Sequence, residues 1–168
     1  MHGRASRGQL RRGLVALLGA LILGTGVALA TPVPVLTVSN GATECLGPLD
    51  DGEAMRYSYR QSIYDVAVWE EFQRDGDSLE LRRVRSQDIR SIEYFRWDAP
   101  IAQEPDGWWA AAAPPSGSKE LVIRIAPLGQ QRIATARWSC DMLARFGEAV
   151  VTVRAERRPF VLTLLSAR

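Results

Sequence analysis

The sequence is nearly without histidine and lysine. Of the 168 residues, only His2 is a histidine and only Lys119 is a lysine. His2 lies in a basic N-terminal segment, and without residues 1–30 no imidazole remains as a general base or a metal ligand. Glycine-rich phosphate loops and clusters of metal-ligating residues are also missing. We therefore exclude histidine-based hydrolysis for the rest of the chain and expect no enzyme, no metal and no cofactor.

The N-terminus has the pattern of a targeting segment. Residues 1–12 contain four arginines and no acid, and residues 14–23 form an uncharged apolar block. Ala28 and Ala30 then supply the small side chains that precede a cleavage site, so cleavage after Ala30 is one reading. An uncleaved anchor is the other, because a spanning helix needs about 20 apolar residues. Either reading places the remaining chain outside the cytoplasm, in the periplasm or anchored to the inner membrane and facing it.

Removing residues 1–30 reverses the sign of the net charge. Four of the 21 Lys and Arg residues lie there and none of the 19 acids, so the remainder carries 17 basic and 19 acidic residues. A nucleic-acid partner loses its main support, because the basic excess belongs to the targeting segment. We expect a short Pro-containing linker over 31–34 and one domain over 35–168, which is long enough to bury its own core.

Short alternating segments separated by turns dominate the expected domain. Met55, Tyr57 and Tyr59 alternate with polar residues, the period that places apolar side chains on one face of a strand. The Asn40-Gly41 and Asp75-Gly76 pairs are hairpin turn signals. The expected strands are 35–38, 55–60, 66–72, 79–84, 93–96, a short one around Trp109, 120–126, 131–136, 149–153 and 160–165, with the segments on either side of 127–129 forming a hairpin. Asp141 and Gly147 bound one short helix. This pattern predicts an all-β fold, either a β-sandwich or a partly closed barrel.

Two cysteines, Cys45 and Cys140, remain in the expected domain. In an oxidising compartment they could form a disulfide that closes a long loop, which the chain-entropy model values at about 4 to 5 kcal/mol. Two small buried thiols are the alternative, because the sequence does not give the Cα separation on which pairing depends.

Glu70 is the carboxylate that the pattern places on an apolar face. It shares that face with Val68 and Phe72, where a bare charge is costly, so we expect a partner and take an arginine as the default. A hairpin bent at 63–65 would bring Gln61 and Ser62 beside Glu70, where both can donate hydrogen bonds to it. We expect this cluster to stabilise the hairpin, and to serve as a binding site only if one edge stays open to solvent.

Aromatic residues are concentrated in the middle of the chain. Trp108 and Trp109 lie in a stretch rich in Pro, Gly and Ala, 98–118, which predicts a long loop of the kind that often carries function. Exposed, these rings could stack on a sugar or another organic ligand, whereas buried rings would belong to the core. A freestanding small-ligand-binding domain is therefore one functional hypothesis.

One stretch, 57–72, combines an aromatic strand with a Ser-Ile step at 62–63 and with Val68 and Glu70. In these residues and their spacing the chain resembles a bacterial family labelled domain of unknown function eighteen-fifty. Gln61 stands where that family has a His, and Ala67 where it has a Pro. The likeness continues through the segments 85–86, 93–97 and 143–147, and covers most of 35–158.

What the resemblance implies is an accessory role in solute uptake. Genes of that family commonly neighbour tripartite ATP-independent periplasmic (TRAP) transporters of the TAXI type. The resemblance therefore implies a binding or scaffold module in the periplasm, with a TRAP-type permease or its solute-binding protein as a partner and an organic acid or a similar solute as the cargo.

Overall fold

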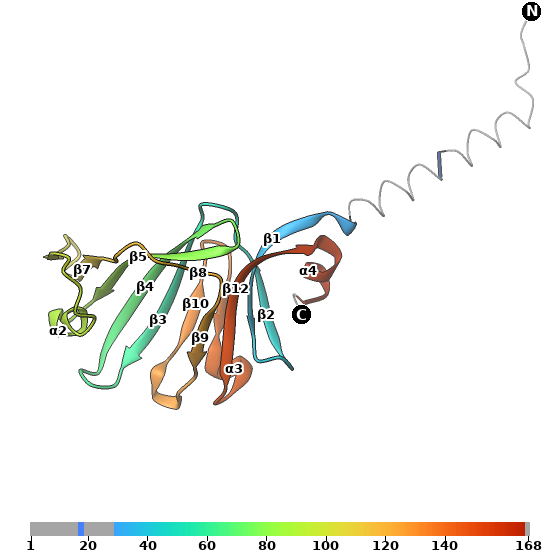
Figure 1. Ribbon diagram of the computed structural model, residues 1–168. Helices are drawn as coiled ribbons and strands as arrows, with labels where there is room; N and C mark the ends of the chain where they lie inside the picture. Colours follow the sequence, from blue (N-terminus) through green and yellow to red (C-terminus); the bar gives the residue numbers. More distant parts are fainter. Residues whose placement is uncertain (1–16, 19–28, 167–168) are drawn as a thin grey trace, which may run out of the picture.

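The domain is built from two antiparallel sheets packed face to face (Figure 1). The computed structural model describes residues 17–18 and 29–166, so the predicted signal peptide or anchor lies almost entirely outside the described residues. Within those residues no helix has the length and apolar character needed to cross a membrane. The predicted all-β class is confirmed, and the two sheets form an open sandwich, not a closed barrel.

The smaller sheet has four strands in the order β2-β1-β12-β9. Their bounds are β1 Pro32–Ser39, β2 Glu44–Pro48, β9 Leu121–Arg124 and β12 Val150–Pro159. The linker prediction is wrong, because the sheet begins at Pro32, which pairs with Pro159. Proline is tolerated at positions 32 and 34 because β2 pairs with β1 only from Val35 onward. The first residues of β1 therefore have no strand partner on that side that would need a backbone N–H.

The larger sheet has the order β11-β10-β3-β4-β5-β7-β6, and β8 also pairs with β5. Its strands are β3 Ala54–Gln61, β4 Val66–Asp75, β5 Ser78–Ser86, β6 Ile101–Gln103, β7 Trp109–Ala112, β8 Gly117–Ser118, β10 Arg132–Ala134 and β11 Ser139–Asp141. The expected hairpins from 54 to 86 are present. This sheet extends past the smaller one at its β5–β7 end (Figure 1).

Three short α-helices and one 3-10 turn complete the described part of the chain: α2 Ile89–Glu93, η1 Pro127–Gly129, α3 Met142–Phe146 and α4 Phe160–Ser166. The predicted strand at 93–96 is wrong, because Asp88 caps α2 by accepting from the Arg90 N–H, and turns follow the helix. The short helix bounded by Asp141 and Gly147 is confirmed.

The predicted last strand, 160–165, is the helix α4. A continuous apolar run fits a buried strand or a helix equally well, so periodicity does not separate them. The available pairing partner decides between strand and helix. Pro159, the last residue of β12, pairs with Pro32, the first residue of β1, and the Phe160 N–H donates to the Thr31 carbonyl. The sheet therefore has no partner left for a longer strand.

The expected hairpin around 127–129 is also wrong. β9 pairs with β12 and β10 pairs with β3 and β11, so the two segments belong to different sheets. The Gln131 side chain explains the separation, since its Oε1 accepts from the Ala126 N–H at 2.8 Å and its Nε2 donates to the Arg124 carbonyl at 2.8 Å. A hairpin between 120–126 and 131–136 would need the Ala126 N–H and the Arg124 carbonyl for its own backbone hydrogen bonds, but the Gln131 side chain already binds both.

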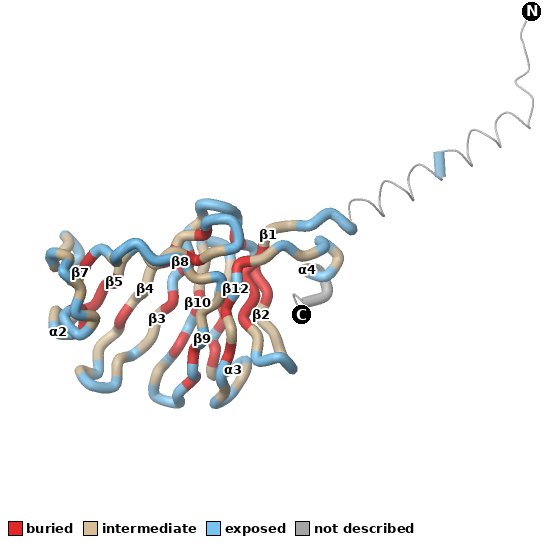
Figure 2. The backbone as a smooth tube through the Cα atoms, in the orientation of Figure 1, coloured by how far each residue is buried: buried red, intermediate tan, exposed pale blue. Residues whose placement is uncertain are grey.

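The core lies between the two sheets, and Figure 2 shows the buried positions concentrated along the facing strands. The main cluster includes Leu36, Met55, Phe72, Ile133 and Val153. A second, smaller cluster lies where the larger sheet extends past the smaller one, and α2 covers it there. Its members are Val68, Val84, Ile92 and Ala111, with Trp109 and other partly buried rings packed against them.

Two links join the sheets. Cys45 of β2 and Cys140 of β11 form a disulfide with a Cα–Cα distance of 6.4 Å, so the structure selects pairing over free thiols. Arg74 at the end of β4 is buried and donates to backbone carbonyls only. Its acceptors are Leu49 at 2.7 Å, Gly76 at 2.7 Å, Glu156 at 3.2 Å and Val35 at 3.4 Å, which bring segments of both sheets to one guanidinium.

Candidate functional site

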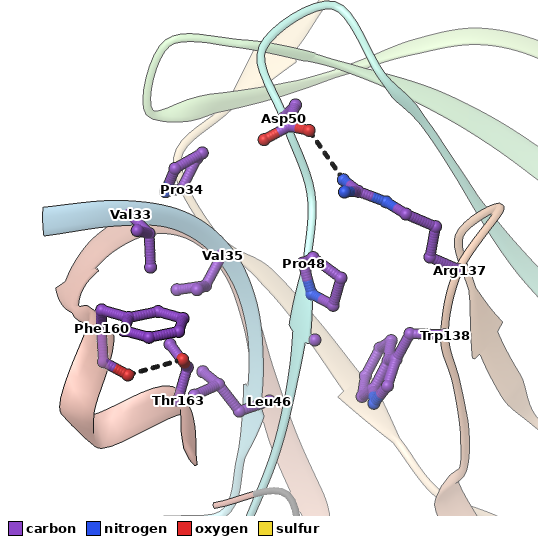
Figure 3. A pocket seen from close by; sticks show the side chains of 11 residues that line it. Val33, Pro34, Val35, Leu46, Pro48, Asp50, Arg137, Trp138, Phe160 and Thr163 are labelled. Atoms are coloured by element: carbon purple, nitrogen blue, oxygen red, sulfur yellow. Dashed lines mark hydrogen bonds and ion pairs between the residues drawn. The ribbon is translucent and has the colours of Figure 1, made fainter.

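An apolar pocket lies at the end of the sandwich where β1 begins and α4 packs beside it (Figure 3). Its volume is about 410 Å³. The lining residues are Val33, Pro34, Val35, Leu46, Gly47, Pro48, Asp50, Arg137, Trp138, Phe160 and Thr163. Pockets of a few hundred Å³ with an apolar lining and a few polar groups are the usual form of a small-molecule site.

Trp138 forms one wall of the pocket because Gly47 leaves room for its indole. A Cβ built on Gly47 would overlap the ring, with the Trp138 Cγ only 2.5 Å away. The disulfide between β2 and β11 holds this arrangement, because Cys45 lies two residues from Gly47 and Cys140 lies two residues from Trp138. Glycine at 47 is thus required by a side chain of the opposite sheet.

α4 supplies the opposite wall. Phe160 and Val33 lie on one side of the pocket in Figure 3 and Trp138 on the other, with Pro48 between them. The first turn of the helix is held by the Thr163 hydroxyl, which donates to the Phe160 carbonyl at 2.7 Å. Phe160 remains 40% exposed, so the helix covers the pocket without closing it.

Two charged residues, Asp50 and Arg137, form the polar rim of the pocket, and Glu53, which does not line it, shares the Arg137 guanidinium. The Arg137 Nη2 lies 2.8 Å from the Asp50 carboxylate and 2.7 Å from the Glu53 carboxylate. Glu53 also accepts from the Asp50 backbone N–H at 2.9 Å. Two carboxylates for one guanidinium leave a net negative charge, so this rim disfavours an anionic ligand group.

A second hollow, of about 430 Å³, lies along β9 and contains Glu70. Glu70 is directly opposite Tyr57 in the β3–β4 ladder and faces the interior with Val68 and Phe72, as the alternation predicts. The predicted arginine partner is wrong, because the side chain that hydrogen-bonds to the Glu70 carboxylate is the hydroxyl of Tyr59. Burial raises the pKa of Glu70, and the Tyr59 hydrogen bond opposes that rise.

The two tyrosines beside Glu70 extend this polar network. Their ring centroids are 5.1 Å apart, and Gln131 Nε2 donates to the Tyr57 hydroxyl at 2.9 Å. Burial raises the pKa of Tyr57 to about 12, with a smaller opposing contribution from the Gln131 hydrogen bond. Burial, followed by the Glu70 charge, raises the pKa of Tyr59 further. Both phenols therefore stay protonated at neutral pH.

The expected cluster of Gln61, Ser62 and Glu70 does not form. A four-residue turn over 62–65 places Gln61 opposite Val66, four positions along the ladder from Glu70. The Asp65 N–H donates to the Gln61 carbonyl, and the Asp65 carboxylate accepts from the Arg60 guanidinium. The turn closes on these contacts, so Gln61 and Ser62 stay at the hairpin tip while Glu70 lies in the middle of the strand.

Trp108 and Trp109 point to opposite faces of the larger sheet. Trp109 packs into the cluster beneath α2, so it is a core residue. Trp108 lies on the outer face against Trp69, with ring centroids 4.1 Å apart. Arg56 lies 4.3 Å from the Trp69 centroid, and Arg85 lies 5.5 Å from that of Trp108. The two rings therefore contact each other and the guanidinium groups of Arg56 and Arg85.

Ion pairs anchor this outer face to the loop before β7. Arg85 reaches Glu104 at 2.6 Å and Asp106 at 2.5 Å, and Arg83 reaches Glu104 at 2.8 Å. Asp106 also accepts from the Trp108 N–H at 3.2 Å. These contacts hold the loop on the sheet and account for the stacked tryptophans as a structural cluster.

The pocket of Figure 3 carried no signal in the sequence, because its walls come from four segments between residues 33 and 163. The described part of the chain contains no group of three or more Cys, Asp, Glu or His residues placed to hold a metal ion. Comparison with protein-family models, curated proteins and solved structures finds no match for this chain.

Proposed function

We propose that this chain is an extracytoplasmic binding module, without catalytic activity, that takes the apolar body of a small uncharged molecule into the pocket between Trp138 and α4. The pocket itself carries the proposal: about 410 Å³ of space with an apolar lining and a single polar rim. The rim chemistry selects the ligand class, because a carboxylate head would face Asp50, while Arg137, the guanidinium of the rim, is already shared by Asp50 and Glu53. A hydroxyl or amide head can instead share the hydrogen bonds of the rim.

Two further observations support binding. The disulfide and Gly47 fix the Trp138 wall, which makes a preformed site with little ordering cost. A disulfide in a domain of this size also fits an oxidising compartment, in agreement with the targeting pattern of the N-terminus.

Calorimetric titration of the domain with 1-octanol and with octanoate tests this function. We expect saturable binding of octanol and binding of octanoate at least fivefold weaker. Val33→Trp fills the pocket from its half-buried edge and should abolish octanol binding. Ile63→Trp, at an exposed site on the β3–β4 turn, is the matched control and should leave binding unchanged. Equal binding to both tryptophan variants would overturn the assignment.

The transporter partner rests on the family resemblance and stays a prediction. Affinity purification of the tagged full-length chain from native membranes should recover a TRAP-type permease or its solute-binding protein. A preparation without either protein, together with unchanged solute uptake after deletion of the gene, would remove this partner while leaving the ligand proposal in place.

A further inference from the structure

The hollow that contains Glu70 is the open side of the sandwich. β9 is an edge strand of the smaller sheet, and in the described part of the chain it pairs only with β12. Its other side faces the inner surface of β3 and β4. The hollow is therefore bounded by the edge of one sheet and the face of the other, and its lining residues are Tyr57, Glu70, Phe72 and Glu120 to Arg124. None of them lines the pocket of Figure 3.

Glu70 has no cationic partner among the described residues. Its carboxylate hydrogen-bonds to Tyr59, and no ion pair joins it to a basic side chain in the described part of the chain. Glu120, the other acid of the hollow, is paired with Arg154. Arg124 also lines the hollow, but its side chain is exposed and makes no ion pair with Glu70. A carboxylate charge on an apolar face is costly when no cation compensates it, and a ligand cation would reduce that cost.

The aromatic rings beside Glu70 add to the attraction for a cation. Tyr57 lines the hollow, and the Tyr59 ring packs against it. Aromatic faces attract ammonium groups, and the attraction is stronger where water is excluded. A carboxylate with adjacent phenol rings is thus chemically suited to a protonated amine, and Phe72 offers an apolar surface for the rest of such a ligand.

The short edge of β9 favours a small molecule over a peptide strand. β9 has four residues, and the carbonyl of Arg124 is already taken by Gln131. Alternate residues of an edge strand direct their backbone groups outward, so Val122 is left as the one fully available pairing position. We propose that Glu70, with Tyr57 and Tyr59, forms a binding site for a small organic ammonium ion at the open side of the sandwich.

Ligand-detected NMR on the Val33→Trp variant, in which the pocket of Figure 3 is filled, tests this site with n-butylamine at pH 7 and with n-butanol as its uncharged counterpart. We expect the amine to bind at least tenfold more tightly than the alcohol. Glu70→Gln keeps the shape of the side chain and should weaken amine binding at least tenfold without changing alcohol binding, which also shows that the variant is folded. Glu93→Gln makes the same change at an exposed carboxylate of α2 and should have no effect.

The Val33→Trp variant separates this inference from the proposed function, because it fills only the other pocket. Amine binding should survive it. Equal affinity for amine and alcohol, or amine binding that is insensitive to Glu70→Gln, overturns the ammonium site whatever happens to octanol. Tight binding of a lysine-containing extended tripeptide, with no binding of n-butylamine, would also overturn it and assign the edge of β9 to strand pairing.

Discussion

At the scale of single residues, Glu70 is the position where stability and binding conflict. The alternation of β4 identified its apolar surroundings correctly, but the sequence did not identify Tyr59 as its partner. The partner depends on the tight turn at 62–65, which sets the ladder register and keeps Gln61 and Ser62 away. Asp65 closes this turn with a φ of 55°, and the alternation of apolar residues does not predict such a backbone conformation.

The raised pKa of Glu70 predicts a pH-dependent effect of Glu70→Gln. Between the ordinary glutamate pKa and the raised one, the folded state binds more protons than the unfolded state, so the free energy of unfolding of the native protein falls as pH rises. The glutamine variant escapes this loss and should be more stable by about 1 kcal/mol at pH 7. Below pH of about 4, where glutamate is protonated in both states, the difference should vanish.

Urea unfolding at pH 3.5, 5 and 7 measures this difference, with Glu93→Gln as the control. The Glu93 side chain is exposed, so its variant should follow the native protein at each pH. A Glu70→Gln protein that is less stable than the native one at pH 7 would show that the carboxylate has a structural duty.

At the scale of elements, turn residues and alternation predicted hairpins between adjacent segments, whereas pairing between distant segments was not predictable from them. The turn at 75–78 and the alternation of β3 and β4 were sufficient for the hairpins between 54 and 86, whereas the Asn40-Gly41 turn was recognised without the strand that follows it, β2. The segments around 127–129 look like a third hairpin, but Gln131 occupies the backbone groups that would pair and sends β10 to the other sheet. α4 differs from its prediction because β1 has no residues left to pair with it.

The pocket of Figure 3 shows the same limit. Its tryptophan was visible in the sequence, but its position depends on Gly47 in another sheet and on a helix that periodicity did not predict. Contacts between segments about 90 residues apart have no local pattern. The lack of histidine argued only against histidine-based chemistry, and the two proposed sites are located by the three-dimensional arrangement alone.

Arg74 links several elements, although no pattern in the sequence singled it out. Arg74→Met preserves much of the side-chain volume and leaves the carbonyls of Leu49, Gly76 and Glu156 without their donor. We expect a loss of about 3 kcal/mol in the free energy of unfolding, because buried carbonyls without partners each cost a substantial part of that. Chemical denaturation measures it, and Arg82→Met, at an exposed arginine of β5, should cost no more than about 0.5 kcal/mol. Similar losses for both variants would contradict the role of Arg74.

At the scale of the whole molecule, the disulfide is the covalent link between the two sheets. Cys45 and Cys140 are separated by 95 residues, so reduction releases a large loop in the unfolded chain. The chain-entropy model predicts a loss of about 4 to 5 kcal/mol for a loop of this length. Unfolding of the Cys45→Ala, Cys140→Ala double variant, compared with the oxidised protein, tests this value. A loss below about 1 kcal/mol would mean that the sheets hold together without the link.

Loss of the disulfide should also weaken the binding site. Trp138 and Gly47 are each two residues from one of the cysteines, so the wall of the pocket depends on the strands that the disulfide joins. The whole molecule is thus a small sandwich whose covalent link lies beside one site, with the second, ammonium-binding site at the open side formed by β9.

Fluorine NMR tests most directly whether the pocket beside Trp138 binds the ligand. Protein labelled with 5-fluorotryptophan has five tryptophan resonances, one for each Trp of the sequence. On titration with 1-octanol, we predict a saturable shift of the Trp138 resonance, assigned through Trp138→Phe, while the stacked Trp69 and Trp108 keep theirs. A shift confined to Trp69 and Trp108, with Trp138 unmoved, would contradict the account.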